Sequence, residues 1–415
     1  MKAAKVSSYL YTLLILGFLY FSLGFALGIN GLLIPYLKKA FDLSNTDSYL
    51  VLTATFSAFV LFGYPSGLLI QKIGYKKGML VSFVLFAIGL YLFVPSAKTE
   101  SFLLFLIASF ISGMGNTLLQ AVVGAYVTIC GPTDSALKRF SVLSIINKLG
   151  WAVAPVFLAM FLDLNQTNIL LSDMFLPFYI IVGIFVLMGI IIWLSPLPEV
   201  KAKGEEKKDE NLSEESIIIQ NFVAAKKNIF QFPHLIFGAL ALFFHMGIEI
   251  IALASVVDFA HTLGLNNPEL YPSLTVGWLI FGCLLGTFLV PRVISQLSAL
   301  RYCTFLGLLL SLLTVLLPVD YAIYGVTLMG LSSSLIWAAI FPLSLAYLGK
   351  YTKLGSSILV IAVVGGAVGP LIFGWLKDVL GNMQKAYWIC FPSYIFILFY
   401  AYKGYKIGLQ KINPS

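Results

Sequence analysis

The chain is a series of long apolar runs separated by short polar segments. An α-helix needs about 20 mostly apolar residues to cross a bilayer, and each run is about that long or longer. The pattern predicts twelve transmembrane helices along the 415 residues. The predicted spans are 8–36, 48–71, 78–96, 101–129, 138–162, 174–195, 234–261, 272–298, 300–318, 321–348, 356–378 and 386–408. We therefore expect an all-α, polytopic membrane protein.

The longest polar stretch, 197–230, separates six predicted spans from six. It is rich in lysine and glutamate, a composition typical of solvated loops. We expect an N-terminal six-helix bundle over 1–196, a cytoplasmic linker over 197–230 and a C-terminal six-helix bundle over 231–415.

The two predicted bundles also resemble each other. Ser141–Pro155 aligns without gaps to Ser356–Pro370, and the alignment matches Gly150 with Gly365. Both segments follow a predicted cytoplasmic loop and open the fifth helix of their bundle. A chance match between apolar sequences is the alternative, but parallel repeats of this kind build one large class of transporters.

Composition agrees with a lipid environment. Hydrophobic residues make up 60% of the chain and charged residues 11%, against roughly 45–50% and about 25% in soluble domains. The four cysteines are scattered without the spacing of a disulfide framework or a zinc site. We expect no metal and no cofactor.

The net charge of +8 follows the predicted topology. With both termini in the cytoplasm, 20 of the 26 lysines and arginines fall on the cytoplasmic side, five fall outside, and Lys148 lies within a helix. This bias agrees with the positive-inside rule. We expect a multi-pass protein of a cell membrane, of the bacterial inner-membrane type, and the charge requires no nucleic-acid partner.

The segment Gly67–Gly78 resembles the signature loop of the major facilitator superfamily, in which a glycine and an acidic–basic pair precede a second glycine and a basic cluster. Here Gly74 is followed by Tyr75, Lys76 and Lys77, and Gln71 stands where the signature has Asp. A narrower resemblance, to the glucose/galactose transporter branch of the fucose/galactose/glucose:proton symporters, covers nearly the whole chain. It rests on Asn30–Lys39, Leu118–Gln120, Tyr126–Pro132, Arg139–Lys148, Gly247–Glu249, Trp337, Ile340–Leu343 and Leu348–Ser357.

The resemblance implies the major facilitator fold and secondary transport of a sugar. The chain also departs from the pattern of its relatives. Fucose permease has an acidic pair where this chain has Gly31 and Gln120, and three polar positions of the glucose/galactose branch are replaced by Gly124, Ala254 and Ser333. The resemblance therefore leaves open which sugar is carried, and whether transport is coupled to an ion.

Ionisable residues inside predicted spans are candidates for coupling, because a charge in hydrocarbon is costly. Glu249 lies near the middle of the seventh span, and His245 precedes it by four residues on the same helix face. We expect Glu249, with His245, to load and release a proton. The alternative is that Glu249 pairs with Lys148 as a structural bridge.

Sugars are recognised by amide and carboxyl groups that bind hydroxyls and by an aromatic ring against the sugar face. Spans 1, 4, 5 and 10 supply such groups. The candidates are Asn30, Asn116, Gln120, Asn147, Lys148 and Trp337. Asn116 and Gln120 are four residues apart and so share a helix face, although intramembrane amides also serve to join helices.

The leading hypothesis is uptake of a neutral monosaccharide, a hexose such as glucose or galactose, by symport with a proton or sodium through alternating access. An uncoupled facilitator, a carrier of another sugar or polyol, and a sugar sensor that does not transport are the alternatives. The chain carries no nucleotide-binding or hydrolytic motif, so we do not expect an enzyme. We expect the transporter to work as a monomer.

Overall fold

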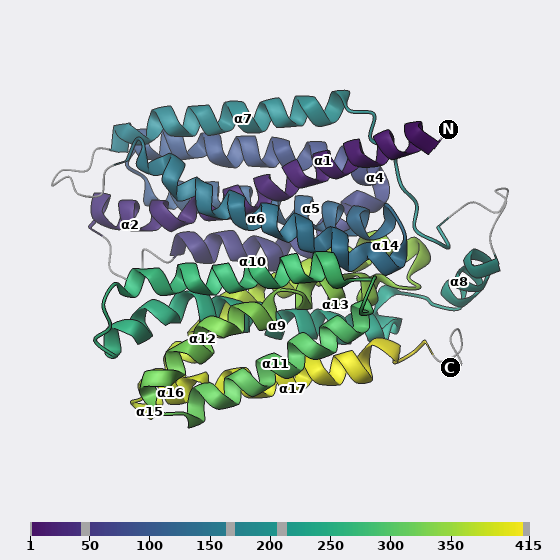
Figure 1. Cartoon of the computed structure of the whole chain (residues 1–415). Coiled ribbons are helices and arrows are strands. Elements are labelled where there is room, and N and C mark those ends of the chain that lie inside the picture. Colours follow the sequence, from purple (N-terminus) through teal and green to yellow (C-terminus); the bar gives the residue numbers. More distant parts are fainter. Residues whose placement is uncertain (1, 43–49, 163–170, 206–213, 410–415) are drawn as a thin grey trace. The chain divides into compact units, whose positions relative to one another are not determined.

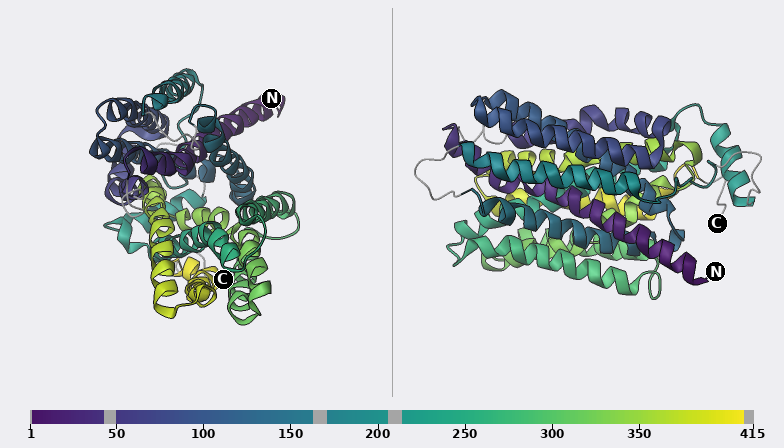
Figure 2. Two further views of the ribbon diagram at one scale, coloured as in Figure 1. Left: turned by 90° about the vertical axis from the view of Figure 1, so that its left-hand side faces the viewer. Right: turned by 90° about the horizontal axis from the view of Figure 1, so that it is seen from above.

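The computed structural model describes residues 2–42, 50–162, 171–205 and 214–409, and within these ranges the chain is helical, without a strand (Figures 1 and 2). Contacts between Cα atoms divide the chain into two compact units. Unit 1 comprises Met1–Tyr126 and Leu143–Val200, and unit 2 comprises Val127–Val142 and Lys201–Ser415. Each unit is described by itself.

Unit 1 is built from long helices. They are α1 (Lys2–Gly28), α2 (Asn30–Ala40), α4 (Leu50–Lys98), the greater part of α5 (Phe102–Ile129), the greater part of α6 (Ala136–Ala159), the short η2 (Leu171–Met174) and α7 (Phe175–Leu194). Helices α4 and α7 pack against each other extensively.

Unit 2 is centred on one helix, α9, which contacts most of the others. The long helices are α9 (Pro233–Thr262), α10 (Tyr271–Leu289), α11 (Gln296–Leu316), α12 (Val319–Ser333), α13 (Ile336–Leu345), α14 (Thr352–Ile361), α15 (Gly365–Leu380) and α17 (Cys390–Tyr402). The short elements are η1 (Thr133–Ser135), α8 (Glu214–Ala224), η3 (Ile229–Gln231), η4 (Pro268–Leu270), η5 (Gly349–Tyr351), η6 (Ala362–Val364), α16 (Met383–Ala386), η7 (Tyr387–Ile389) and η8 (Gly404–Lys406).

Ten segments of the described chain are long and apolar enough to cross a membrane. One of them, α4, has 49 residues. As one continuous helix it would be about 74 Å long at 1.5 Å per residue, more than twice the thickness of a hydrocarbon core. Gly74 interrupts α4 with φ 83° and ψ 176°, so α4 contains two of the predicted spans. The last predicted span is divided among α16, η7 and α17. The structure therefore agrees with twelve spans.

Several predicted spans are discontinuous. Span 321–348 is divided at Ser334 and Leu335 between α12 and α13, whereas span 8–36 comprises α1 and α2, which meet at Ile29 with helical backbone angles (φ −51°, ψ −41°). Span 356–378 changes to a 3₁₀ turn at η6 before it continues as α15. Broken helices inside a membrane are tolerated where other protein groups satisfy the backbone, and they are common near transporter binding sites.

The predicted boundary between the eighth and ninth spans is wrong. The sequence predicts a helix over 272–298, but α10 ends at Leu289 and α11 begins at Gln296. Ser295 caps α11, because its hydroxyl accepts a hydrogen bond of 3.0 Å from the N–H of Ser298. A serine at this position marks a helix start, which apolar periodicity alone does not detect.

The internal repeat has a structural counterpart in close helix contacts. A methyl group on Gly150 of α6 would overlap the carbonyl oxygen of Phe21 in α1, and a methyl group on Gly365 of α15 would overlap the carbonyl oxygen of Phe243 in α9. The two aligned glycines thus bring the backbone of the fifth predicted span against that of the first span in its own unit. Small residues at helix interfaces allow such approach in membrane proteins.

The last long helix of unit 2 is fastened by hydroxyl pairs. Tyr387, Tyr394 and Tyr400 are fully buried. Their hydroxyls lie 2.6 Å from Ser255 in α9, 2.7 Å from Ser332 in α12 and 2.7 Å from Ser344 in α13, respectively. Each phenol is satisfied inside the bundle, as buried polar groups must be.

The glycine contact predicts a difference between two substitutions in the same helix. Gly365→Ala should lower the stability of the protein by about 1–3 kcal/mol, because overpacking moves α15 away from α9. Gly374→Ala should be neutral or stabilising, because a methyl group there meets no atom within 4 Å. Thermal unfolding in detergent measures both, and equal midpoints for the two variants would contradict the packing argument.

Candidate functional site

Two of the predicted sugar-binding amides of unit 1 bind the backbone of α1. The Nδ2 atom of Asn116 donates to the carbonyl of Leu23 at 3.3 Å, and the Nδ2 atom of Asn147 donates to the carbonyl of Tyr20 at 3.0 Å. The two carbonyls are three residues apart and so lie on one face of α1. The structure therefore brings α5 and α6 together on α1 through the very amides that the sequence singled out.

These contacts leave acceptor atoms on α5. The Oδ1 atom of Asn116 and the Oε1 atom of Gln120 are buried and have no hydrogen-bond partner within the described part of the chain. Buried polar atoms without a partner are uncommon and call for a physical explanation. An amide oxygen accepts hydrogen bonds from hydroxyl groups, so Gln120 has the chemistry to bind a sugar hydroxyl.

The two other predicted sugar-binding residues of unit 1 add less. Lys148 follows Asn147 directly on α6 and is half-buried. The side chain of Asn30 lies outside the described residues, although its backbone begins α2 directly after Ile29. Their roles in binding stay predictions.

The predicted coupling residues form a close pair in unit 2. The Nε2 atom of His245 lies 3.5 Å from the Oε2 atom of Glu249, and the side chains are 1% and 10% exposed. Both residues lie on α9, one turn apart. A carboxyl group and an imidazole at this distance are able to share or pass a proton. By contrast, Asp258 and His261 near the end of α9 are exposed.

Trp337 lies at a break in its helix. It is the second residue of α13, directly after Ser334 and Leu335 interrupt the predicted span. Its ring centroid lies 5.5 Å from that of Phe341, which in turn lies 5.6 Å from Phe140. The half-buried indole is therefore held on one side by an aromatic row.

The sequence analysis missed this row and the helix break beside it. Phe140 and Phe341 lie within the family motifs but were not singled out. A run of three serines, Ser332–Ser334, is the signal that could have located the break, because serine side chains compete with the helix for backbone hydrogen bonds. At three positions the glucose/galactose branch has a polar residue that this chain replaces. Of the residues that stand there in this chain, Gly124 and Ser333 are buried and Ala254 is exposed.

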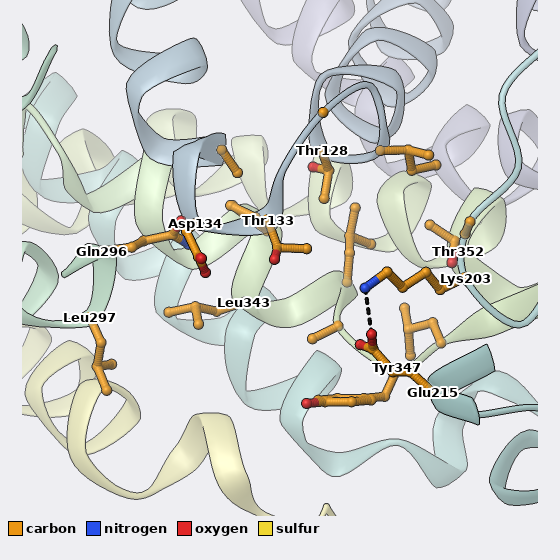
Figure 3. A pocket seen from close by; sticks show the side chains of 18 of the residues that line it. Thr128, Thr133, Asp134, Lys203, Glu215, Gln296, Leu297, Leu343, Tyr347 and Thr352 are labelled. Carbon is orange, nitrogen blue, oxygen red and sulfur yellow. Dashed lines mark hydrogen bonds and ion pairs between the residues drawn. The ribbon is translucent and has the colours of Figure 1, made fainter. Parts of the chain in front are cut away.

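A cavity of about 690 Å³ lies in unit 2, away from these residues (Figure 3). Figure 3 shows Thr128, Thr133 and Asp134 on one side and Lys203 with Glu215 on another, joined by an ion pair of 2.6 Å. None of the eight predicted site residues lines this cavity. Its volume would hold a small solute, but it contains none of the buried amide oxygens that have no partner in the described chain, and we do not assign the sugar site to it.

Comparison with known proteins extends over the whole chain. The model of the Major Facilitator Superfamily matches residues 16–370. The glucose/galactose transporter of Brucella abortus (biovar 1, strain 9-941) is 31% identical, with 98% of this chain and 97% of that protein covered. The L-fucose-proton symporter of Escherichia coli K12 is 24% identical, with 97% of this chain and 95% of that protein covered.

Solved structures agree on the fold. FucP, a Major Facilitator Superfamily transporter in the outward conformation, gives a TM-score of 0.81 at 23% identity and covers 95% of this chain and 98% of its own. The proton:xylose symporter XylE, bound to 6-bromo-6-deoxy-D-glucose, gives 0.74 at 16% identity, with 95% of both chains covered. The chain is thus a multi-pass membrane transporter of the Major Facilitator Superfamily, related to the glucose/galactose transporters and the L-fucose-proton symporters.

Proposed function

We propose that this protein takes up a neutral hexose, of the glucose or galactose type, by symport with a proton. Relatives named glucose/galactose transporter and L-fucose-proton symporter support the substrate class and the coupling ion. We place the protein in a bacterial inner membrane as a monomer, with both termini and the linker 197–230 in the cytoplasm and six-helix bundles over 1–196 and 231–415.

The observation that carries the sugar-binding part is the buried Oε1 atom of Gln120, which has no partner among the described side chains and backbone. A bound hydroxyl would satisfy it. Asn116 and Asn147 hold the neighbouring helices on α1 with one amide group each and keep their oxygen atoms for other partners. We assign Asn30, Lys148 and Trp337 to the same sugar site, with Trp337 placed against the apolar face of the sugar.

The pair of His245 and Glu249 supports coupling. A carboxyl group within an apolar helix is costly to ionise, so its proton is expected to be taken up and released as the surroundings change. The imidazole of His245, 3.5 Å away, gives that proton a neighbouring acceptor. We assign the coupling step to Glu249, with His245 as its partner.

Uncoupled transport is the second candidate. It is favoured by Gly31 and Gln120, neither of which ionises, at the two positions where fucose permease carries acids. A facilitator, or a carrier of another sugar or polyol, would need only the amide groups. A sensor without transport is the third reading, and it would bind sugar without moving it.

Uptake by the purified protein in liposomes distinguishes these functions. With labelled glucose, galactose, fucose and mannose, we expect accumulation of at least one sugar above equilibration when the outside is acidic. The same uptake is measured with a sodium gradient in place of the pH gradient. Equilibration without accumulation under either gradient would indicate a facilitator, and saturable binding without uptake would indicate a sensor.

The assignment of Glu249 is tested by its neutral analogue. Glu249→Gln should abolish accumulation driven by a pH gradient but retain sugar exchange between equal concentrations, because exchange requires no net proton movement. Asp258→Asn, an exposed carboxylate on the same helix, serves as the control and should accumulate sugar normally. Full gradient-driven accumulation by Glu249→Gln would show that the proton binds elsewhere.

The assignment of Gln120 is tested by affinity. Gln120→Leu should weaken sugar binding about 10- to 100-fold, since losing one buried hydrogen bond to the substrate costs roughly 1–3 kcal/mol. Gln71→Leu, at an exposed position, is the matched control. Binding measured by calorimetry on both variants decides the point, and an unchanged dissociation constant for Gln120→Leu would remove this residue from the site.

A further inference from the structure

The segment Ser195–Glu199, which we call the strap, follows α7 and is extended. Ser195 and Leu197 are buried, whereas Pro196, Pro198 and Glu199 are exposed. This alternation is typical of an extended segment lying on a surface. The first residues of the polar stretch are therefore packed against unit 1, where the sequence predicted the start of a solvated linker.

Four hydrogen bonds fasten the strap to two other helices of unit 1. The Glu199 carboxylate accepts from the N–H groups of Tyr75 at 2.6 Å and Lys76 at 3.2 Å. The ammonium of Lys76 donates to the carbonyl of Ser195 at 2.6 Å, and the Tyr126 hydroxyl donates to the carbonyl of Pro198 at 2.9 Å. The strap thus joins the end of α7 to the break in α4 and to the last part of α5.

Glu199 performs a specific task at the break in α4. The helix restarts after Gly74, where the first N–H groups of a helix need acceptors from outside its own backbone, and Glu199 accepts from those of Tyr75 and Lys76. A carboxylate satisfies these groups and interacts favourably with the positive end of the helix. Glycine suits this position because Gly74 has a φ of 83°, which side chains rarely adopt, and a methyl group there would lie 2.7 Å from a carboxylate oxygen of Glu199.

The strap binds the same helix, α5, that carries Gln120 of the proposed sugar site. Tyr126, which binds the strap, lies six residues beyond Gln120 on the same helix, about 9 Å along its axis. Tyr75, at the Glu199 contact, is fully buried and its ring packs edge-on against Tyr126 at 6.1 Å. The break in α4 and the ends of α5 and α7 are therefore joined through the strap, in which Glu199 is 124 positions from its partner Tyr75.

We propose that Glu199 is a positioning residue for transport: by capping the second half of α4 it locks the strap, so that α4, α5 and α7 move together during the transport cycle. This inference rests on the proposed sugar transport. Glu199 touches no substrate in this scheme. Its loss should slow translocation and leave sugar affinity unchanged.

Hydrogen–deuterium exchange tests the contact directly, without any sugar. In Glu199→Gln the amides of Tyr75 and Lys76 should exchange about tenfold faster, as expected for loss of a charged helix cap, and in Glu199→Ala faster still. Glu215→Gln is the matched control, since Glu215 pairs with an exposed lysine in unit 2. Exchange in α17 reports global stability and should be the same in all variants. Unchanged exchange at Tyr75 and Lys76 would overturn the inference.

Transport kinetics test the role. In liposomes, Glu199→Gln should lower the maximal rate about three- to tenfold with a KM within about twofold of the parent, the effect of an altered conformational step. Faster amide exchange with an unchanged maximal rate would overturn the positioning role, as would a change confined to KM. Failure of the proposed function itself is distinguishable, because then the unaltered protein would move no labelled sugar.

Discussion

Lipid offers no hydrogen-bond partner to a protein, and this constraint governs the rest of the structure. Backbone groups are satisfied within helices, and many hydroxyls are satisfied by their own helix. Thr55, Thr117 and Thr304, for example, each donate to the carbonyl four residues earlier. Because so many polar groups are satisfied locally, those that are not become informative. The buried amide oxygens of Asn116 and Gln120 have no partner within the described part of the chain.

Close packing of backbones decides where those groups lie. In each unit the fifth predicted span packs closely against the first through glycines, Gly24, Gly28 and Gly150 in unit 1 and Gly247, Gly365 and Gly369 in unit 2. In unit 1 the same interface carries the hydrogen bond from Asn147 to α1. The candidate binding residues are therefore mounted on helices with little freedom to shift. Such mounting suits a transporter, in which binding groups keep their geometry while whole bundles move.

Residues at the beginning of the polar stretch 197–230 make specific contacts with other parts of the chain. Its first residues are bound to unit 1 through Glu199, and Glu205 forms an ion pair of 2.7 Å with Lys353 within unit 2. In the loop Gly67–Gly78, Gln71 stands where the loops of related proteins have an acid. An acidic residue from a distant segment, Glu199, nevertheless contacts this loop. The Glu199 carboxylate accepts hydrogen bonds from the backbone N–H groups of Tyr75 and Lys76, and the sequence of the loop does not reveal this contact.

The sequence alone determined the helical class, the twelve spans and the residues worth testing, because apolar run length and polar positions within apolar runs are local properties. The resemblance of its ordered motifs to those of known transporters indicated the family. Tertiary structure decided the rest. At the break in the tenth predicted span, the carbonyl of Ser334 accepts from the thiol of Cys283, and at the break in α4 the N–H of Tyr75 donates to Glu199. Both partners lie far away along the chain. Apolar periodicity reports that a residue is buried. It does not report its partner, which for Tyr75 lies 124 positions away along the chain.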